Sequence, residues 1–95
     1  MTVYFHEEDL PAGALGPGAV AVDTETMGLN PLRDRLCVVQ ISDGKGDEHL
    51  VRFNPGSDYA APNLKAVLAD PERIKIYHFG RVDIAAIQHY LGVVA

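Results

Sequence analysis

The sequence predicts an α/β domain, built as a mixed sheet with flanking helices. Two apolar runs, residues 19–24 and 35–42, have the length and composition of strands. Two later segments, residues 62–69 and 81–91, carry apolar side chains at helical spacing. One more alternating strand, residues 73–79, lies between these helices. We therefore expect a sheet that begins with antiparallel strands and later gains a parallel strand through a helical crossover.

Each element has its own local signal. The near-continuous apolar character of residues 19–24 predicts a strand that is buried on both faces. Residues 91–95 look like a helix end followed by the start of another apolar strand, so we expect residues 1–95 to be the N-terminal part of a single larger domain. The other segments complete the order: a strand at 2–5, a Gly- and Pro-rich loop at 6–18, a turn at 43–47, a hairpin strand at 48–53, a polar loop at 54–61, and a break at Gly80 before the last helix.

Composition limits the function classes. Thirteen acidic and eight basic residues give a formal net charge of -5, which disfavours binding of long nucleic acid by bulk electrostatics. A short phosphate-bearing substrate held by bound metal stays compatible with this charge. The single cysteine, Cys37, lies in an apolar run, which predicts a buried structural thiol. This cysteine usage and the lack of a signal-peptide pattern suggest a cytoplasmic protein, and no apolar stretch approaches the ~20 residues of a membrane helix.

The strongest functional signal is the acidic pair Asp23 and Glu25 at the end of an apolar strand. Side chains two residues apart on a strand point to the same side, so the two carboxylates stand next to each other. Their mutual repulsion is relieved by a divalent cation, and oxygen ligands suit Mg²⁺ or Mn²⁺. The alternative interpretation is a pair of surface acids with no metal.

A third acid, Asp83, falls on the inward stripe of the last predicted helix, in line with Ile87, Tyr90 and Leu91. A favourable interaction with the helix dipole explains an acid in the first turn, but it does not explain an inward direction. A buried carboxylate needs a partner or a metal. Asp83 is therefore the third candidate ligand.

Several residues beside these acids are candidates for substrate binding. Gly28 would allow a ligand to approach the backbone closely, and Arg81 would reach a phosphate. Packing, turn formation or solvation explains each of them equally well when it is taken alone. The full set is Met27, Gly28, Leu29, His78, Phe79 and Arg81.

Taken together, these residues resemble the DEDD superfamily of 3'-5' exonucleases, which have a ribonuclease H-like fold. Residues 23–26 match the first motif, Asp-x-Glu, and residues 78–83 match the second, in which an aspartate opens a helix after a strand that ends in His and a small-residue turn. The spacing suits the ribonuclease D branch. Residues 23–31 and 33–40 resemble most closely the short alphaproteobacterial, oligoribonuclease-type members called nanoRNase C. The resemblance covers nearly the whole chain.

The resemblance implies two-metal phosphodiester hydrolysis of short single-stranded RNA, down to dinucleotides, with Mg²⁺ or Mn²⁺ as cofactor. It assigns Asp23 to both metals, Glu25 to one of them and Asp83 to the other. It places Leu29 and Phe79 against bases. It also implies homo-oligomers, which unfinished sheet edges would favour.

One departure from the family is large. Its members carry a third motif, Tyr-x-x-x-Asp or His-x-x-x-Asp, which supplies the last metal ligand and a residue that activates water. In this sequence Tyr90 would need an aspartate at position 94, where Val94 stands. Three of the four acids are thus present, and we expect the 95 residues alone to be inactive or nearly so.

Two other hypotheses belong to different classes. The chain is a non-catalytic module of the same fold that binds a nucleotide or a partner protein, or it is an acidic-pocket receiver domain. The receiver hypothesis needs a lysine at a second strand end, and no lysine occupies such a place convincingly.

Overall fold

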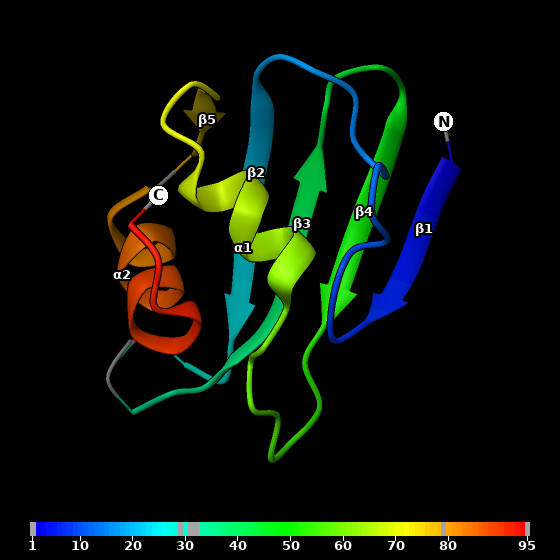
Figure 1. Ribbon diagram of the computed structural model, residues 1–95. Coiled ribbons are helices and arrows are strands. Elements are labelled where there is room, and N and C mark those ends of the chain that lie inside the picture. The colour runs from blue at the N-terminus through cyan, green and yellow to red at the C-terminus, as the bar shows by residue number, and fades with distance from the viewer. Residues whose placement is uncertain (1, 29, 31–32, 79, 95) are drawn as a thin grey trace.

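The computed structural model describes residues 2–28, 30, 33–78 and 80–94. Within these residues the chain forms one mixed sheet of five strands and two helices, in the strand order β1-β4-β3-β2-β5 (Figure 1). The predicted fold class is therefore confirmed. The elements are β1 (Thr2–Glu7), β2 (Val20–Thr26), β3 (Leu36–Ser42), β4 (Asp47–Arg52), α1 (Pro62–Ala69), β5 (Lys75–Ile76) and α2 (Gly80–Leu91).

The centre of the sheet is antiparallel and both edges are parallel. β3 pairs antiparallel with β2 and with β4, which confirms the predicted hairpin. β5 joins β2 in parallel after α1, as the crossover predicts. β1 pairs in parallel with β4 at the far edge and extends to Glu7, two residues beyond its predicted end. The sequence carried no signal for this pairing, because it depends on register between distant segments.

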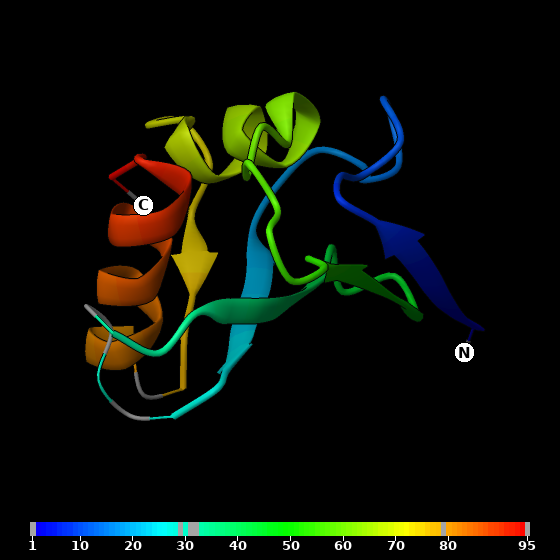
Figure 2. The ribbon, with the colours of Figure 1, turned by 90° about the horizontal axis from the view of Figure 1, so that it is seen from below.

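In the described part of the chain, helices cover one face of the sheet. Both α1 and α2 lie on the same side, as Figure 2 shows. The prediction that β2 is buried on both faces is wrong: Val20 and Val22 are buried, whereas Ala21 and Asp23 are exposed. A continuous apolar run is compatible with one open face, because the small side chain of Ala21 exposes little apolar surface to water. The open face of β2 is where the acidic pair emerges.

Three other expectations need correction. Among the described residues of the strand predicted at 73–79, Lys75–Ile76 form the strand β5, which pairs with Val20 and Ala21 of β2, and residue 79 lies outside the described residues. Residues 92–94 form no strand, because Gly92 ends α2 with a φ of 71° and donates its N–H to the carbonyl of Gln88. Cys37 is partly exposed instead of buried.

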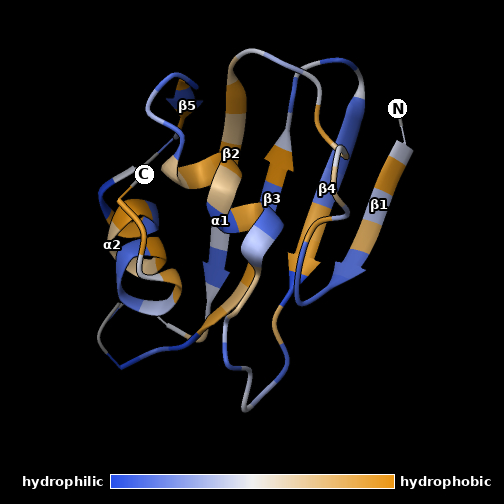
Figure 3. Ribbon diagram, in the orientation of Figure 1, coloured by the Kyte–Doolittle hydropathy of each residue, from blue (hydrophilic) through white to orange (hydrophobic). Residues whose placement is uncertain are grey.

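The hydrophobic core lies between the helices and the sheet. In Figure 3 the apolar part of β2 precedes a hydrophilic end. No helix among the described residues is long and apolar enough to cross a membrane. The core residues are Leu10, Val20, Val22, Leu36, Val39, Ile41, Val51, Phe53, Ala61, Leu64, Leu68, Ala86, Ile87 and Leu91.

Aromatic contacts fix the position of α2. Tyr90 lies on α2 with its ring centroid 5.3 Å from that of Tyr59, which in turn lies 5.0 Å from Phe53. The Tyr59 hydroxyl donates a hydrogen bond of 2.9 Å to the carbonyl of Leu36 at the start of β3. This chain of contacts ties the C-terminal half of α2 to the central hairpin, and so determines where its first turn lies.

Asp9, which follows β1, caps the N-terminus of α1. Its carboxylate accepts hydrogen bonds from the backbone N–H groups of Leu64, at 2.8 Å, and Asn63, at 3.0 Å. The residue at the N-cap position, Ala61, has no side chain that can do this and has a φ of 34°. The cap of α1 is thus supplied by a distant segment.

We predict that Asp9→Ala lowers the free energy of unfolding by about 1–2 kcal/mol, because two helix N–H groups lose their acceptor. Chemical denaturation measures this loss. Glu72→Ala, which removes an equal charge from an exposed position, should change the free energy much less. Equal effects of the two substitutions would refute the capping role.

Two histidines pair on the β1–β4 edge. The His6 Nε2 and His49 Nδ1 atoms lie 2.9 Å apart, and Tyr4 stacks on the His49 ring. Burial lowers the pKa of His6 below its ordinary value of 6.5, and the neighbouring His49 lowers it further. The fold therefore favours the neutral form of His6.

We predict that the stability of the chain falls as the pH drops below about 6.5, the ordinary pKa of His6. The reason is that the unfolded chain binds a proton there more readily than the folded chain does. His6→Gln should flatten this dependence between pH 7 and pH 5 in thermal unfolding. An unchanged slope in His6→Gln would show that other groups cause it.

Candidate active site

β2 presents the acidic pair on the open face of the sheet. Asp23 and Glu25 are both exposed, and in the sheet register they lie opposite Gln40 and Val38 of β3. The core residue Val22 holds the preceding part of the strand in place. The two carboxylates thus share one side of the strand, as their spacing predicts.

Thr24 points to the other side of β2, toward α2. Its hydroxyl donates a hydrogen bond of 2.5 Å to Oδ1 of Asp83. Asp83 is 6% exposed and lies in the first turn of α2, so the prediction that it faces inward is confirmed. The structure therefore brings Asp83 into hydrogen-bond contact with the strand segment that carries the acidic pair.

A hollow of about 310 Å³ opens beside Asp23. Gln40 of β3 and Glu48 of β4 line it, and the Gln40 side-chain amide donates to the Glu48 carboxylate at 3.3 Å. Tyr77 and His78, which follow β5, line the other side. Sequence reasoning missed Gln40 and Glu48, although a glutamine inside an otherwise apolar strand was a usable signal.

Tyr77 lines the hollow and is near enough to Asp83 for the charge of Asp83 to act on it. Burial raises the pKa of its hydroxyl above the ordinary value of 10.0, and the negative charge of Asp83 raises it further. The hydroxyl oxygen is buried and has no hydrogen-bond partner among the residues that the structure describes. Gly80 lets α2 start close to this residue, since a Cβ at Gly80 would lie 3.0 Å from Cβ of Tyr77.

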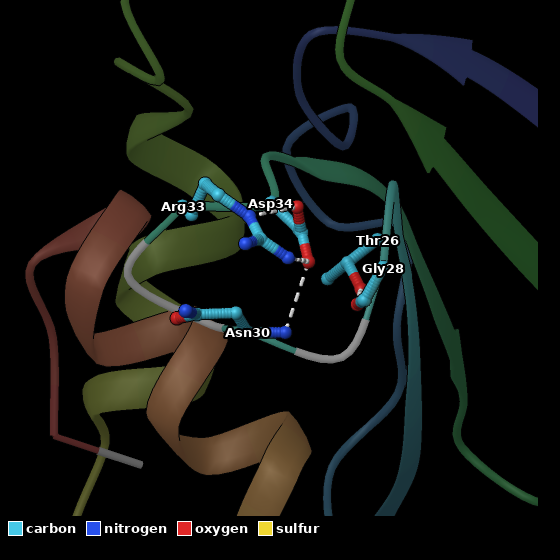
Figure 4. A network of polar contacts seen from close by, with 5 residues as sticks. All are labelled: Thr26, Gly28, Asn30, Arg33 and Asp34. Carbon is cyan, nitrogen blue, oxygen red and sulfur yellow. Dashed lines mark hydrogen bonds and ion pairs between the residues drawn. The ribbon is translucent and has the colours of Figure 1, made fainter.

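The loop after β2 is closed by Asp34. As Figure 4 shows, its carboxylate accepts a hydrogen bond from the N–H of Asn30, at 3.0 Å, and pairs with Arg33 at 3.1 Å. Hydrogen bonding to Arg33, then to the Asn30 backbone, lowers the pKa of Asp34. A Cβ at Gly28 would collide with the Asp34 carboxylate. The absence of a side chain at Gly28 thus makes room for the Asp34 carboxylate.

The other candidate substrate residues that the structure describes are exposed. Met27 is 68% exposed. His78 is exposed and lines the hollow, and Arg81 is exposed on the first turn of α2. Leu29 and Phe79 lie outside the described residues.

The carboxylate oxygens of Asp23 and Glu25 suit a hard cation such as Mg²⁺, but these two side chains do not complete its coordination by themselves. In the described parts of the chain no group of three or more His, Cys, Asp or Glu side chains could hold a metal ion. Asp23 and Glu25 supply carboxylate oxygens on one open face. Mg²⁺ commonly binds through one or two carboxylates and keeps waters or substrate phosphates as its other ligands. The acidic pair therefore fits Mg²⁺ as part of a larger ligand set.

Comparison with known proteins identifies the family. The family model described as "3'-5' exonuclease" matches residues 4–95. The chain belongs to this family. A comparison with curated protein sequences gives no match.

Solved structures support the same assignment. The chain is 49% identical to Brucella melitensis NrnC, with a TM-score of 0.93, over 99% of this chain and 46% of that one. NrnC structures with bound Mg²⁺ and bound to pGG match equally well. Escherichia coli RNase D, described as an exoribonuclease involved in structured RNA processing, is 32% identical with a TM-score of 0.57, over 78% of this chain and 19% of that one. The chain thus spans about half the length of its NrnC relatives.

We predict that Asp34→Ala speeds amide hydrogen exchange at Asn30 several-fold, because that N–H loses its carboxylate acceptor. Exchange at Met27 serves as an internal control, since its N–H bonds to the backbone carbonyl of Arg35. Exchange measured by NMR should separate the two sites. Unaltered exchange at Asn30 would show that Asp34 does not close the loop.

Proposed function

We propose that this chain is the N-terminal part of a 3'-5' exoribonuclease domain that hydrolyses phosphodiester bonds of short RNA. One observation carries the proposal. Asp23 and Glu25 stand side by side at the open end of β2, next to a hollow, in a chain 49% identical to an NrnC that was solved with Mg²⁺ and with pGG. Two adjacent carboxylates at such a position have a chemical use in metal binding that folding alone does not require.

In this proposal Asp23 and Glu25 hold Mg²⁺ or Mn²⁺, and Asp83 contributes to a second metal position with Asp23. A metal pair of this kind supplies an activated water and stabilises the leaving oxygen. The strand backbone fixes Asp23 and Glu25 in one orientation, since Val20 and Val22 anchor β2 in the core. The fixed carboxylates lose little conformational freedom when they bind.

The features around the acids favour a short substrate. The hollow of about 310 Å³ has room for a small group rather than a long strand. His78 lines the hollow and Arg81 is exposed on the first turn of α2, and both are the proposed phosphate contacts. Met27, Gly28, Leu29 and Phe79 complete the proposed substrate surface, the last two as stacking residues. A net charge of -5 also disfavours a long polyanion.

Residues 1–95 contain three of the four acids that the family resemblance implies. We therefore propose that this segment is inactive by itself and needs a Tyr-x-x-x-Asp or His-x-x-x-Asp segment.

We also propose a homo-oligomer. β1 is an edge strand whose Phe5 is 79% exposed, and an edge of this kind favours pairing with another chain.

We predict that a chimaera of residues 1–95 and the remaining part of Brucella melitensis NrnC releases mononucleotides from short RNA in Mn²⁺. Asp23→Asn should abolish this release, because a neutral amide cannot replace a carboxylate that would bind metal. The measurement is separation of labelled products by size. Asp58→Asn, which neutralises an exposed loop acid, is the control and should retain activity. Full activity in Asp23→Asn would overturn the proposed function.

A second candidate function is a non-catalytic module that binds a nucleotide or a partner protein. The observation in its favour is that the described residues include no ready-made group of three metal ligands. Equal Mn²⁺ binding by the wild-type chain and Asp23→Ala would support this candidate. Loss of Mn²⁺ binding in Asp23→Ala would support the exonuclease.

A further inference from the structure

The segment Asp23-Thr24-Glu25 carries side chains that point to both sides of β2. The outer two residues are exposed on the open face, whereas Thr24 is half-buried and faces α2. This division follows from the alternation of side chains along a strand. The middle residue is therefore in a position to connect the acidic pair to the helix behind it.

The contact that Thr24 makes is directional. Its hydroxyl oxygen lies 2.5 Å from Oδ1 of Asp83, within the range of short hydrogen bonds from a hydroxyl to a carboxylate. The hydroxyl must be the donor, because an ionised carboxylate only accepts. Thr24 therefore fixes one oxygen of Asp83 and leaves the other, Oδ2, for a different ligand.

Asp83 has few alternatives to this contact. It is 6% exposed, so water replaces a lost partner poorly. Tyr77, whose buried hydroxyl has no partner among the described residues, is near enough for the charge of Asp83 to act on it, but it makes no hydrogen bond to Asp83 there. Thr24 is thus the hydroxyl that orients the Asp83 carboxylate in the described structure.

We propose that Thr24 is a positioning residue, whose hydroxyl holds the Asp83 carboxylate in the orientation that binds metal. The proposal rests on the proposed function, since it assigns Asp83 to a metal position. Thr24 acts through Asp83 and does not touch the metal itself. Threonine satisfies both demands at this place: its β-branched side chain suits a strand, and its hydroxyl supplies the donor.

The test is Mn²⁺ binding to the 95-residue chain, followed by electron paramagnetic resonance, which needs no activity. Thr24→Val keeps the shape of the side chain and removes the donor. It should weaken Mn²⁺ binding about tenfold or more, the usual effect of losing a partner that orients a ligand. Thr24→Ser restores the hydroxyl and should bind within roughly threefold of the wild type.

Two controls separate this role from a general effect on folding. Thr26→Val makes the same substitution two residues later in β2, where the hydroxyl donates to the Gly28 carbonyl, and should leave Mn²⁺ binding unchanged. In an Asp83→Ala background, Thr24→Val should not weaken Mn²⁺ binding further, because the carboxylate that Thr24 positions is already absent. Thermal unfolding checks that each variant is folded. If Thr24→Val does not fold, Thr24→Cys takes its place, since a thiol is a weak donor.

The outcomes distinguish the two proposals. Weakened binding in Asp23→Ala together with wild-type binding in Thr24→Val overturns the role of Thr24 and leaves the exonuclease proposal standing. Additive effects of Thr24→Val and Asp83→Ala also overturn it. Mn²⁺ binding that is the same in the wild type, Asp23→Ala and Thr24→Val overturns the proposed metal site and the role of Thr24 with it.

Discussion

The pairing of β2 with β3 is the constraint on which the rest of the structure depends. Its register places Val22 opposite Ile41 and Thr24 opposite Val39 on the covered face, and Asp23 opposite Gln40 on the open face. A shift of one residue would bury both acids of the pair and expose the core side chains. The free energy gained by burying the core side chains therefore also fixes the side of the sheet to which the acidic pair points.

The second acidic position depends on the packing of α2. Ile87 and Leu91 are buried against the sheet, and Tyr90 contacts Tyr59, whose hydroxyl bonds to the start of β3. These contacts hold the C-terminal half of α2 in place. Since a helix is rigid, they also fix the position of its first turn, which contains Asp83. The same hairpin that orients Asp23 thus also positions Asp83, and Thr24 connects the two.

Local sequence signals were reliable where the structure is local. The bounds of α1 and the central hairpin were predictable, because helical spacing and turn residues report nearest neighbours along the chain. The inward direction of Asp83 was predictable for the same reason. The short β5 and the partners lining the hollow were not, since they depend on which distant strands become neighbours. Gln40 and Glu48 meet only because β3 and β4 pair in one particular register.

The sequence by itself determined the family and the shared side of Asp23 and Glu25, because motif spacing and strand alternation are local properties. Only the tertiary structure decided that one face of β2 stays open, and that the Asp83 carboxylate meets the Thr24 hydroxyl. The physical reason is that helices bury apolar surface on one side of the sheet. That choice leaves the acidic pair in solvent and gives the buried carboxylate a hydroxyl partner.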